Sequence, residues 1–157
     1  MIRVLCHVLR VSLLALAVSL AHAKDSGPKT GHSGPEAGAR SYSQNYKDMV
    51  LATCIASAYK DDAKAGVDAG SSVSALRDWT YYDLEKSPDA ISSLVQGYLA
   101  RDYSNPLVEH DIKGVRFDLL KCLDLYHSKE LDAQVKRLVI HPGRTYRQEH
   151  GREKQRQ

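Results

Sequence analysis

The sequence lacks the short motifs that most often mark an enzyme or a metal site. Its 7 histidines show no zinc-type spacing such as His-Glu-x-x-His, and Gly66 and Gly70 lack the lysine and the spacing of a phosphate-binding loop. The 19 acidic residues form no recognisable acid–base pair, and on a small helical protein such side chains usually face solvent. We therefore expect no catalytic residue, no cofactor and no resident metal.

Long apolar runs are also scarce. The run Val11–Leu20 is too short for a stable transmembrane helix, which needs about 20 residues. It follows Arg3 and Arg10 and precedes Ala21-His22-Ala23, and this order is typical of a signal peptide. No cysteine directly follows, which argues against a lipoprotein anchor. The sequence predicts a signal peptide over residues 1–23, cleaved after Ala23, with a retained N-terminal anchor as the alternative.

The exported chain lacks a strong charge of either sign. Loss of Arg3 and Arg10 lowers the 22 basic residues to 20, against 19 acidic ones, which argues against a nucleic-acid-binding protein. Ser43–Val139 holds 12 basic and 15 acidic residues, whereas His141–Gln157 holds five basic and two acidic ones. The central part is thus mildly acidic. A membrane-touching tail is the weaker alternative to a solvated one.

Two polar segments flank one predicted domain. Lys24–Arg40 is dominated by Gly, Ser, Pro and charge, so we expect a disordered lead-in over residues 24–42. Pro142-Gly143 is a stop signal, so residues 140–157 are expected to form a flexible polar tail. The remaining 43–139 has the size of a single domain.

Apolar residues in this domain recur with helical spacing, and no stretch alternates with period two. Ser41-Tyr-Ser-Gln44 resembles a capping box that opens a first helix, with Val50, Cys54 and Ile55 on its inner face and Asn45 towards the other side. The sequence predicts an all-α fold, a small antiparallel bundle of four to five helices.

Four further signals place the later helices. A second helix is expected over Ala63–Asp83, where small residues allow close packing. Ser87 and Pro88 are interpreted as the N-cap and first residue of a third helix. Val115–His127 is apolar on more than one side, with Val115, Leu119, Cys122 and Tyr126 on one stripe, which indicates a central or shared helix. Ser128 can cap the last helix.

The sequence has only 3 cysteines, and Cys6 would leave with the signal peptide. Cys54 and Cys122 remain, each on an apolar helix face, so in an oxidising compartment we expect them to form a disulfide. The alternative is a cysteine nucleophile with His127 nearby. That chemistry needs an exposed thiolate with a base in reach, which the apolar faces do not favour.

The segment Ala100–Gly114, "ARDYSNPLVEHDIKG", is unusual for a connector. Links between helices are typically about 2–8 residues long, whereas this one is longer and mixes apolar residues with acids. Either it binds a partner, or its apolar residues fold back onto the bundle. His110 between two acids could also bind a metal, although solvated side chains are the simpler interpretation. The candidate partner-binding residues are Asp102, Tyr103, Ser104, Asn105, Pro106, Leu107, Val108, Glu109, His110 and Asp111.

Three stretches carry a family resemblance: "NYKDMVLATCIASAYK", "DAGSSVSALRDW" and "YLARDYSNPLVEHDIKGVRFDLLKCLDLYHSKELDAQVKRLV". Together they span Asn45–Val139 and resemble the type VI secretion amidase immunity family. The resemblance implies a periplasmic helical homodimer that is not an enzyme. It also implies a partner, a papain-like cysteine amidase that cuts the peptide stem of peptidoglycan. In such a pair a protruding loop enters the effector's groove and blocks its Cys–His site, and the dimer mate adds contacts.

We expect Ala100–Gly114 to be this loop, with Leu107 and Val108 filling an apolar subsite and Glu109 and Asp111 meeting basic groups. A periplasmic ligand- or metal-binding helical bundle is the alternative function. An enzyme that uses the carboxylates is a weaker third possibility. Only the first function requires a tight protein partner.

Overall fold

The computed structural model describes residues 34–151, all of which belong to one compact unit, and the predicted signal peptide 1–23 lies outside them. These residues form helices and no strand apart from two isolated bridges, so the all-α prediction is confirmed. No helix in this range is long and apolar enough to cross a membrane. The elements are η1 (Glu36–Ala39), α1 (Tyr42–Ala58), α2 (Ala63–Arg77), α3 (Ser87–Leu99), α4 (Pro106–Asp111), α5 (Asp118–Tyr126), α6 (Lys129–Leu138) and α7 (Tyr146–His150).

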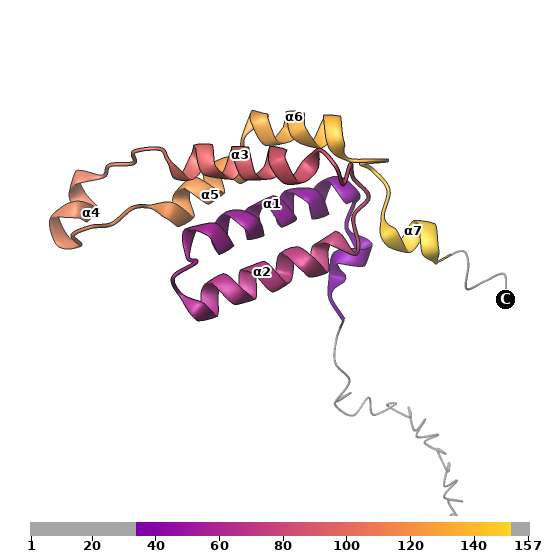
Figure 1. Cartoon of the computed structure of the whole chain (residues 1–157), viewed down its shortest axis with the longest axis horizontal. Coiled ribbons are helices and arrows are strands. Elements are labelled where there is room, and N and C mark those ends of the chain that lie inside the picture. Colours follow the sequence, from indigo (N-terminus) through magenta and orange to yellow (C-terminus); the bar gives the residue numbers. More distant parts are fainter. Residues whose placement is uncertain (1–33, 152–157) are drawn as a thin grey trace, which may run out of the picture. The chain divides into compact units, whose positions relative to one another are not determined.

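Helix α1 is the centre of the fold, in contact with α2, α3, α5 and α6 (Figure 1). It begins at the predicted capping box, because the side chain of Ser41 accepts the backbone N–H of Gln44 and the side chain of Gln44 accepts that of Ser41. Five of its apolar side chains are almost fully buried, namely Tyr42, Tyr46, Met49, Val50 and Cys54.

Asn45 differs from its predicted place on the polar side of α1, because the structure buries it completely. Its Nδ2 donates to the carbonyl oxygens of Ala37 at 2.8 Å and Trp79 at 3.0 Å, and its Oδ1 accepts from Nε of Arg40 at 3.2 Å. A buried amide is tolerated when its hydrogen bonds are made. Periodicity alone cannot reveal partners that come from η1 and from the end of α2.

Two predicted helix ends shift. Helix α2 ends at Arg77 instead of Asp83, and the side chain of Thr80 then donates to the carbonyl of Leu76 at 2.7 Å. The N-cap of α3 is Lys86, so Ser87 is its first residue, not its cap. The Asp83 carboxylate instead accepts the backbone N–H of Lys86 at 2.9 Å, and this bond lowers the pKa of Asp83.

Within the described residues, parts of the predicted lead-in and tail form helices. Both η1 and α7 lie in those segments, and the backbone N–H groups of Tyr42 and Ser43 donate to the carbonyls of Arg144 and Pro142. These are N–H groups at the start of α1, which have no partner inside their own helix. The hydroxyl of Tyr42 donates to Glu149 at 2.7 Å. The packed unit therefore extends beyond 43–139 at both ends.

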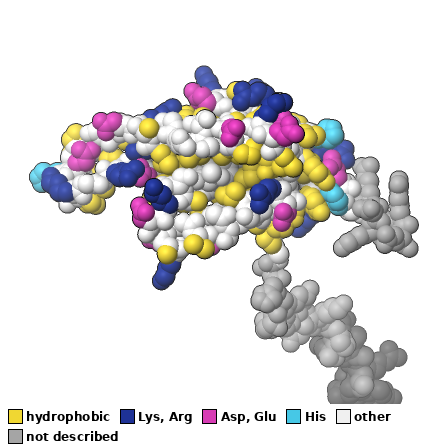
Figure 2. Space-filling view, in the orientation of Figure 1, with side chains coloured by type: hydrophobic (Ala, Val, Ile, Leu, Met, Phe, Trp, Pro, Cys, Tyr) yellow, Lys and Arg dark blue, Asp and Glu magenta, His cyan; other side chains and the backbone are white. Residues whose placement is uncertain are grey.

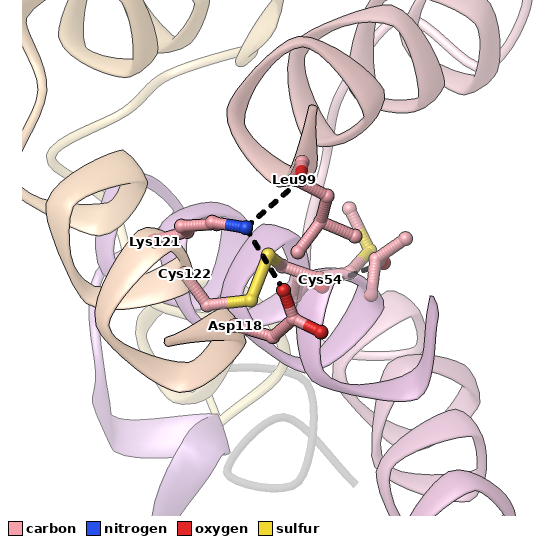
Figure 3. The surroundings of a disulfide bond; sticks show 7 residues. Cys54, Leu99, Asp118, Lys121 and Cys122 are labelled. Carbon is pink, nitrogen blue, oxygen red and sulfur yellow. Dashed lines mark hydrogen bonds and ion pairs between the residues drawn. A yellow bond between two sulfur atoms is a disulfide. The ribbon is translucent and has the colours of Figure 1, made fainter. Parts of the chain in front are cut away.

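The predicted disulfide is confirmed. It joins Cys54 of α1 to Cys122 of α5, and both cysteines are fully buried (Figure 3). The bond removes the thiols that the nucleophile alternative needs. It also ties the central helix to the helix that follows the Ala100–Gly114 segment.

We expect protein cleaved after Ala23 as predicted, and therefore without Cys6, to show no free thiol towards Ellman's reagent under denaturing, non-reducing conditions. Replacement of both cysteines by alanine should lower the free energy of unfolding by about 4 kcal/mol, because the bond closes a loop with a sequence separation of 68 residues. Chemical denaturation of both proteins measures this difference. Titration of two thiols per chain would contradict the disulfide.

Candidate partner-binding site

The segment Ala100–Gly114, here called the α4 loop, leaves the end of α3 and returns towards the start of α5. It projects past the ends of the neighbouring helices, with α4 at its far end (Figure 1). The sequence predicted an irregular loop here. The structure differs, because the middle of the loop is the six-residue helix α4.

The start of α4 explains why Asn105-Pro106 begins a helix as well as ending the preceding helical pattern. Oδ1 of Asn105 accepts the backbone N–H groups of Leu107 at 3.2 Å and Val108 at 3.4 Å, as an N-cap does. Pro106 is the first helical residue, where its missing N–H has no consequence. Oε1 of Glu109 accepts the backbone N–H of Asn105 at 2.7 Å. An Asn-Pro pair followed by an acid was thus the available sequence signal for α4.

The end of α4 is closed by local contacts. The backbone N–H of Ile112 donates to the carbonyl of Val108 at 2.9 Å, and Nζ of Lys113 donates to the carbonyl of Glu109 at 3.0 Å. Gly114 then has φ +75°, a left-handed conformation that glycine adopts without strain. The tip of the loop therefore has a defined backbone.

The apolar residues at the tip differ in exposure. Leu107 is 84% exposed and Ile112 is 56% exposed, whereas Val108 is half-buried. Leu107 therefore does not fold back onto the bundle. The acids around it divide as well: Asp111 is exposed and contacts His110 at 2.8 Å, whereas Glu109 is half-buried. Within residues 34–151 no three His, Cys, Asp or Glu side chains gather as metal ligands would.

The base of the α4 loop is held by side chains. The hydroxyl of Tyr103 donates to Oδ2 of Asp124 in α5 at 2.6 Å, and this bond raises the pKa of Tyr103. The guanidinium of Arg101 lies 3.4 Å from the ring centroid of Tyr98 in α3. Sequence reasoning missed Asp124, because nothing local links it to a residue 21 positions earlier.

An apolar surface lies beside this base. Leu119, Leu120 and Leu123 of α5, here called the α5 patch, are 47%, 47% and 40% exposed. They border a shallow hollow that Tyr59 and Phe117 also line. The predicted stripe placed Leu119 with Cys122 on one face. In the structure the inner face of α5 is instead formed by Lys121, Cys122 and Leu125.

A second hollow lies between α2 and α3, with α1 as its floor. It has a volume of about 250 Å³ and apolar walls that include Met49, Val73 and Ile91, with Arg77 and Gln96 among the polar lining residues. Apolar side chains gather between α2 and α3 on this face (Figure 2). The alternative function, a ligand-binding bundle, would place its ligand here.

Comparison with known proteins places the chain among immunity proteins. The family described as "Type VI secretion system (T6SS), amidase immunity protein", Tai4, matches residues 44–135, which include both cysteines of the disulfide and the whole α4 loop. No curated protein matches the chain.

Two solved structures are similar to the chain. One comes from work on new type VI-secreted toxins and self-resistance proteins in Serratia marcescens. It is 28% identical with a TM-score of 0.65, and the match covers 77% of this chain and 98% of that one. The other is a structure of the Tae4/Tai4 effector–immunity system from Salmonella typhimurium. It is 26% identical with a TM-score of 0.57, and the match covers 67% of this chain and 96% of that one.

The family match spans more than half of the 157 residues and includes helices α2 to α5 entirely. An immunity protein of this kind inhibits an amidase and is not itself an enzyme. This chain therefore belongs to the type VI secretion amidase immunity protein family.

Proposed function

We propose that the protein is exported to the periplasm, where it inhibits a cognate cysteine amidase by inserting the α4 loop into the active-site groove of that enzyme. The observation that carries the proposal is Leu107, an apolar side chain that is 84% exposed at the tip of a capped, projecting helix. The family supports an amidase as the target.

The proposed partner is a peptidoglycan amidase of the Tae4 kind. The support is the likeness to the solved Tae4/Tai4 effector–immunity system, at 26% identity over 67% of this chain. The buried disulfide supports an oxidising compartment such as the periplasm. The signal peptide predicted over residues 1–23 provides the route to it.

The α4 loop suits an inhibitor because much of its order exists before binding. Asn105 and Glu109 fix the start of α4, so fewer backbone conformations are lost on association. Leu107 and Val108 then act as the apolar anchor that enters the groove. The acids around them form a polar rim, in the usual arrangement of an interface core and its edge.

Replacing Leu107 and Val108 together by alanine should weaken effector binding by at least about 2 kcal/mol, as expected for a hot spot. The melting temperature should change little, because Leu107 is largely exposed and Val108 is only half-buried. Calorimetric titration with the amidase measures the affinity, and circular dichroism measures the melting temperature.

The matched control removes the same atoms elsewhere. Leu84 and Val67 are each 67% exposed and lie outside the α4 loop, so the Leu84→Ala and Val67→Ala double variant should bind like the natural protein. A loop variant that loses stability and still protects cells from the amidase would assign the loop to the core and place the inhibitory surface elsewhere.

The acids of the loop should speed association more than they add affinity. Glu109→Lys should slow association, but it also removes the bond that Glu109 makes to the backbone of Asn105. Glu109→Gln keeps an acceptor for that bond and removes only the charge. It should lower the association rate at low salt, and the difference should shrink as salt is added. Stopped-flow mixing measures the rate, with Glu85→Gln as the control, and an unchanged rate at low salt would exclude steering by Glu109.

We further propose that two copies of the chain associate through the α5 patch. Its three leucines are each 40–47% exposed and lie on one short helix, next to a hollow that a second copy could fill. Two-fold dimers are the commonest closed oligomers, and one self-complementary patch is sufficient to form one. The small residues of α2 are a less suitable surface for the association of two copies. At Gly66 an added Cβ would lie 2.9 Å from the carbonyl oxygen of Tyr59, so that glycine serves the α1–α2 turn.

The full mature chain should therefore be a dimer at micromolar concentration by light scattering. Leu119→Glu with Leu123→Glu should give a monomer, because two charges would be buried in the interface. Leu84→Glu, at an exposed leucine outside the patch, should remain a dimer. A natural protein that is monomeric at this concentration would exclude the dimer and any contribution of a mate to inhibition.

A further inference from the structure

We propose that Lys121 of α5 is a positioning residue that joins the two segments flanking the α4 loop and thereby sets how well the loop fits the effector. This inference rests on the function proposed above. It concerns a residue outside the loop, on the helix that follows it.

One contact of Lys121 is with the residue directly before the loop. Its side chain is 6% exposed, and its Nζ donates to the carbonyl of Leu99, the last residue of α3, at 3.2 Å (Figure 3). Carbonyls in the last turn of a helix accept no hydrogen bond from within that helix, and a lysine side chain can donate one to them. The point where the chain leaves α3 is thus held by a charge on α5.

The second contact is with the start of α5, where the chain returns from the loop. Nζ of Lys121 lies 3.1 Å from Oδ1 of Asp118, the first residue of α5, whose side chain is 10% exposed (Figure 3). The other oxygen of that carboxylate lies 3.2 Å from Nε of Arg116, which is largely exposed. A single ammonium group therefore contacts both the residue before the loop and the residue at which the chain re-enters the bundle.

Two neighbouring contacts hold α5 and the base of the loop in place. The next residue, Cys122, is bonded to Cys54 of the central helix, so α5 cannot slide along α1 without breaking a covalent bond. The ring centroid of Tyr103, within the loop, lies 5.9 Å from Nζ of Lys121. The hydroxyl of Tyr103 donates a hydrogen bond to Asp124, one turn after Lys121 in α5. The loop is thus attached to a helix that is itself attached to the core.

The burial of Lys121 calls for such a role. Lysine is rarely fully buried unless it is paired, because moving its charge out of water is costly. Without the ammonium group, the carbonyl of Leu99 loses this donor, and Leu99 and Asp118, which flank the loop, lose their common contact. If only about a tenth of the molecules then hold the loop in its binding position, the apparent dissociation constant rises about tenfold.

The test uses Lys121→Met, which keeps the length of the side chain and removes its charge. Loop order is measured in the free protein as the rate of trypsin cleavage at Arg101, Lys113 and Arg116, and amidase binding is measured as the dissociation constant. We expect faster cleavage at these sites and a dissociation constant raised about tenfold or more. Both measurements are made well below the lowest melting temperature of the set.

Two further variants separate positioning from stability. Lys121→Met with Asp118→Asn removes the carboxylate charge that would otherwise stay buried, and it should fold while showing the same loosening of the loop. Lys47→Met is the matched control, because Nζ of Lys47 pairs with Asp132 of α6 at 3.0 Å, away from the loop. Its cleavage rate in the loop and its dissociation constant should stay within about twofold of the natural values.

Each remaining outcome decides against the inference in a different way. If both Lys121 variants bind normally while Leu107→Ala with Val108→Ala binds weakly, the loop is the plug and Lys121 does not position it. If the Lys121 variants and the loop variant all bind normally, the proposed function is wrong and the positioning role falls with it. If Lys47→Met weakens binding as much as Lys121→Met, the effect reflects lost stability alone.

Discussion

The covalent bond between Cys54 and Cys122 is the constraint on which the other packing relations of this protein depend. It joins α1, which contacts four other helices, to α5, a helix of nine residues that would hold its position weakly by packing alone. Three of the leucines of α5 are partly exposed, so few of its apolar side chains contribute to the core. The disulfide offsets this shortage by restricting the unfolded chain, and it fixes the place at which the α4 loop returns.

The buried core stabilises the fold, whereas the tip of the α4 loop is exposed to solvent. The side chains of Tyr42, Tyr46 and Leu125 are completely buried, whereas Leu107 is 84% exposed. An exposed leucine at the end of a projecting segment contributes little to folding, so substitutions there can alter binding without loss of the fold. Two side chains of α5 hold the base of the loop, because Asp124 accepts from Tyr103 within the loop and Lys121 donates to Leu99, the residue before it.

Much of the candidate site could be predicted from the sequence, but the side-chain contacts at the base of the loop could not. The length of Ala100–Gly114 and its mixture of apolar and acidic residues marked it as a candidate binding segment. The Asn105-Pro106 pair predicted the end of a helix there, whereas in the structure it also begins α4. The burial of Lys121 had no sequence signal, because a lysine in a helix ordinarily faces solvent. Its partners, Leu99 and Asp118, come together only when α3 and α5 pack side by side.

The sequence by itself determined the helical class, the capping of α1 by Ser41 and of α6 by Ser128, and the pairing of the cysteines, since only two follow the predicted signal peptide. These features depend on residues a few positions apart or on simple counting. The tertiary structure decided the burial of Asn45 and the docking of α7 through Tyr42 and Glu149, which are 107 positions apart. Such contacts are set by which surfaces meet when the helices pack, and a pattern along one helix carries no record of the atoms that will face it.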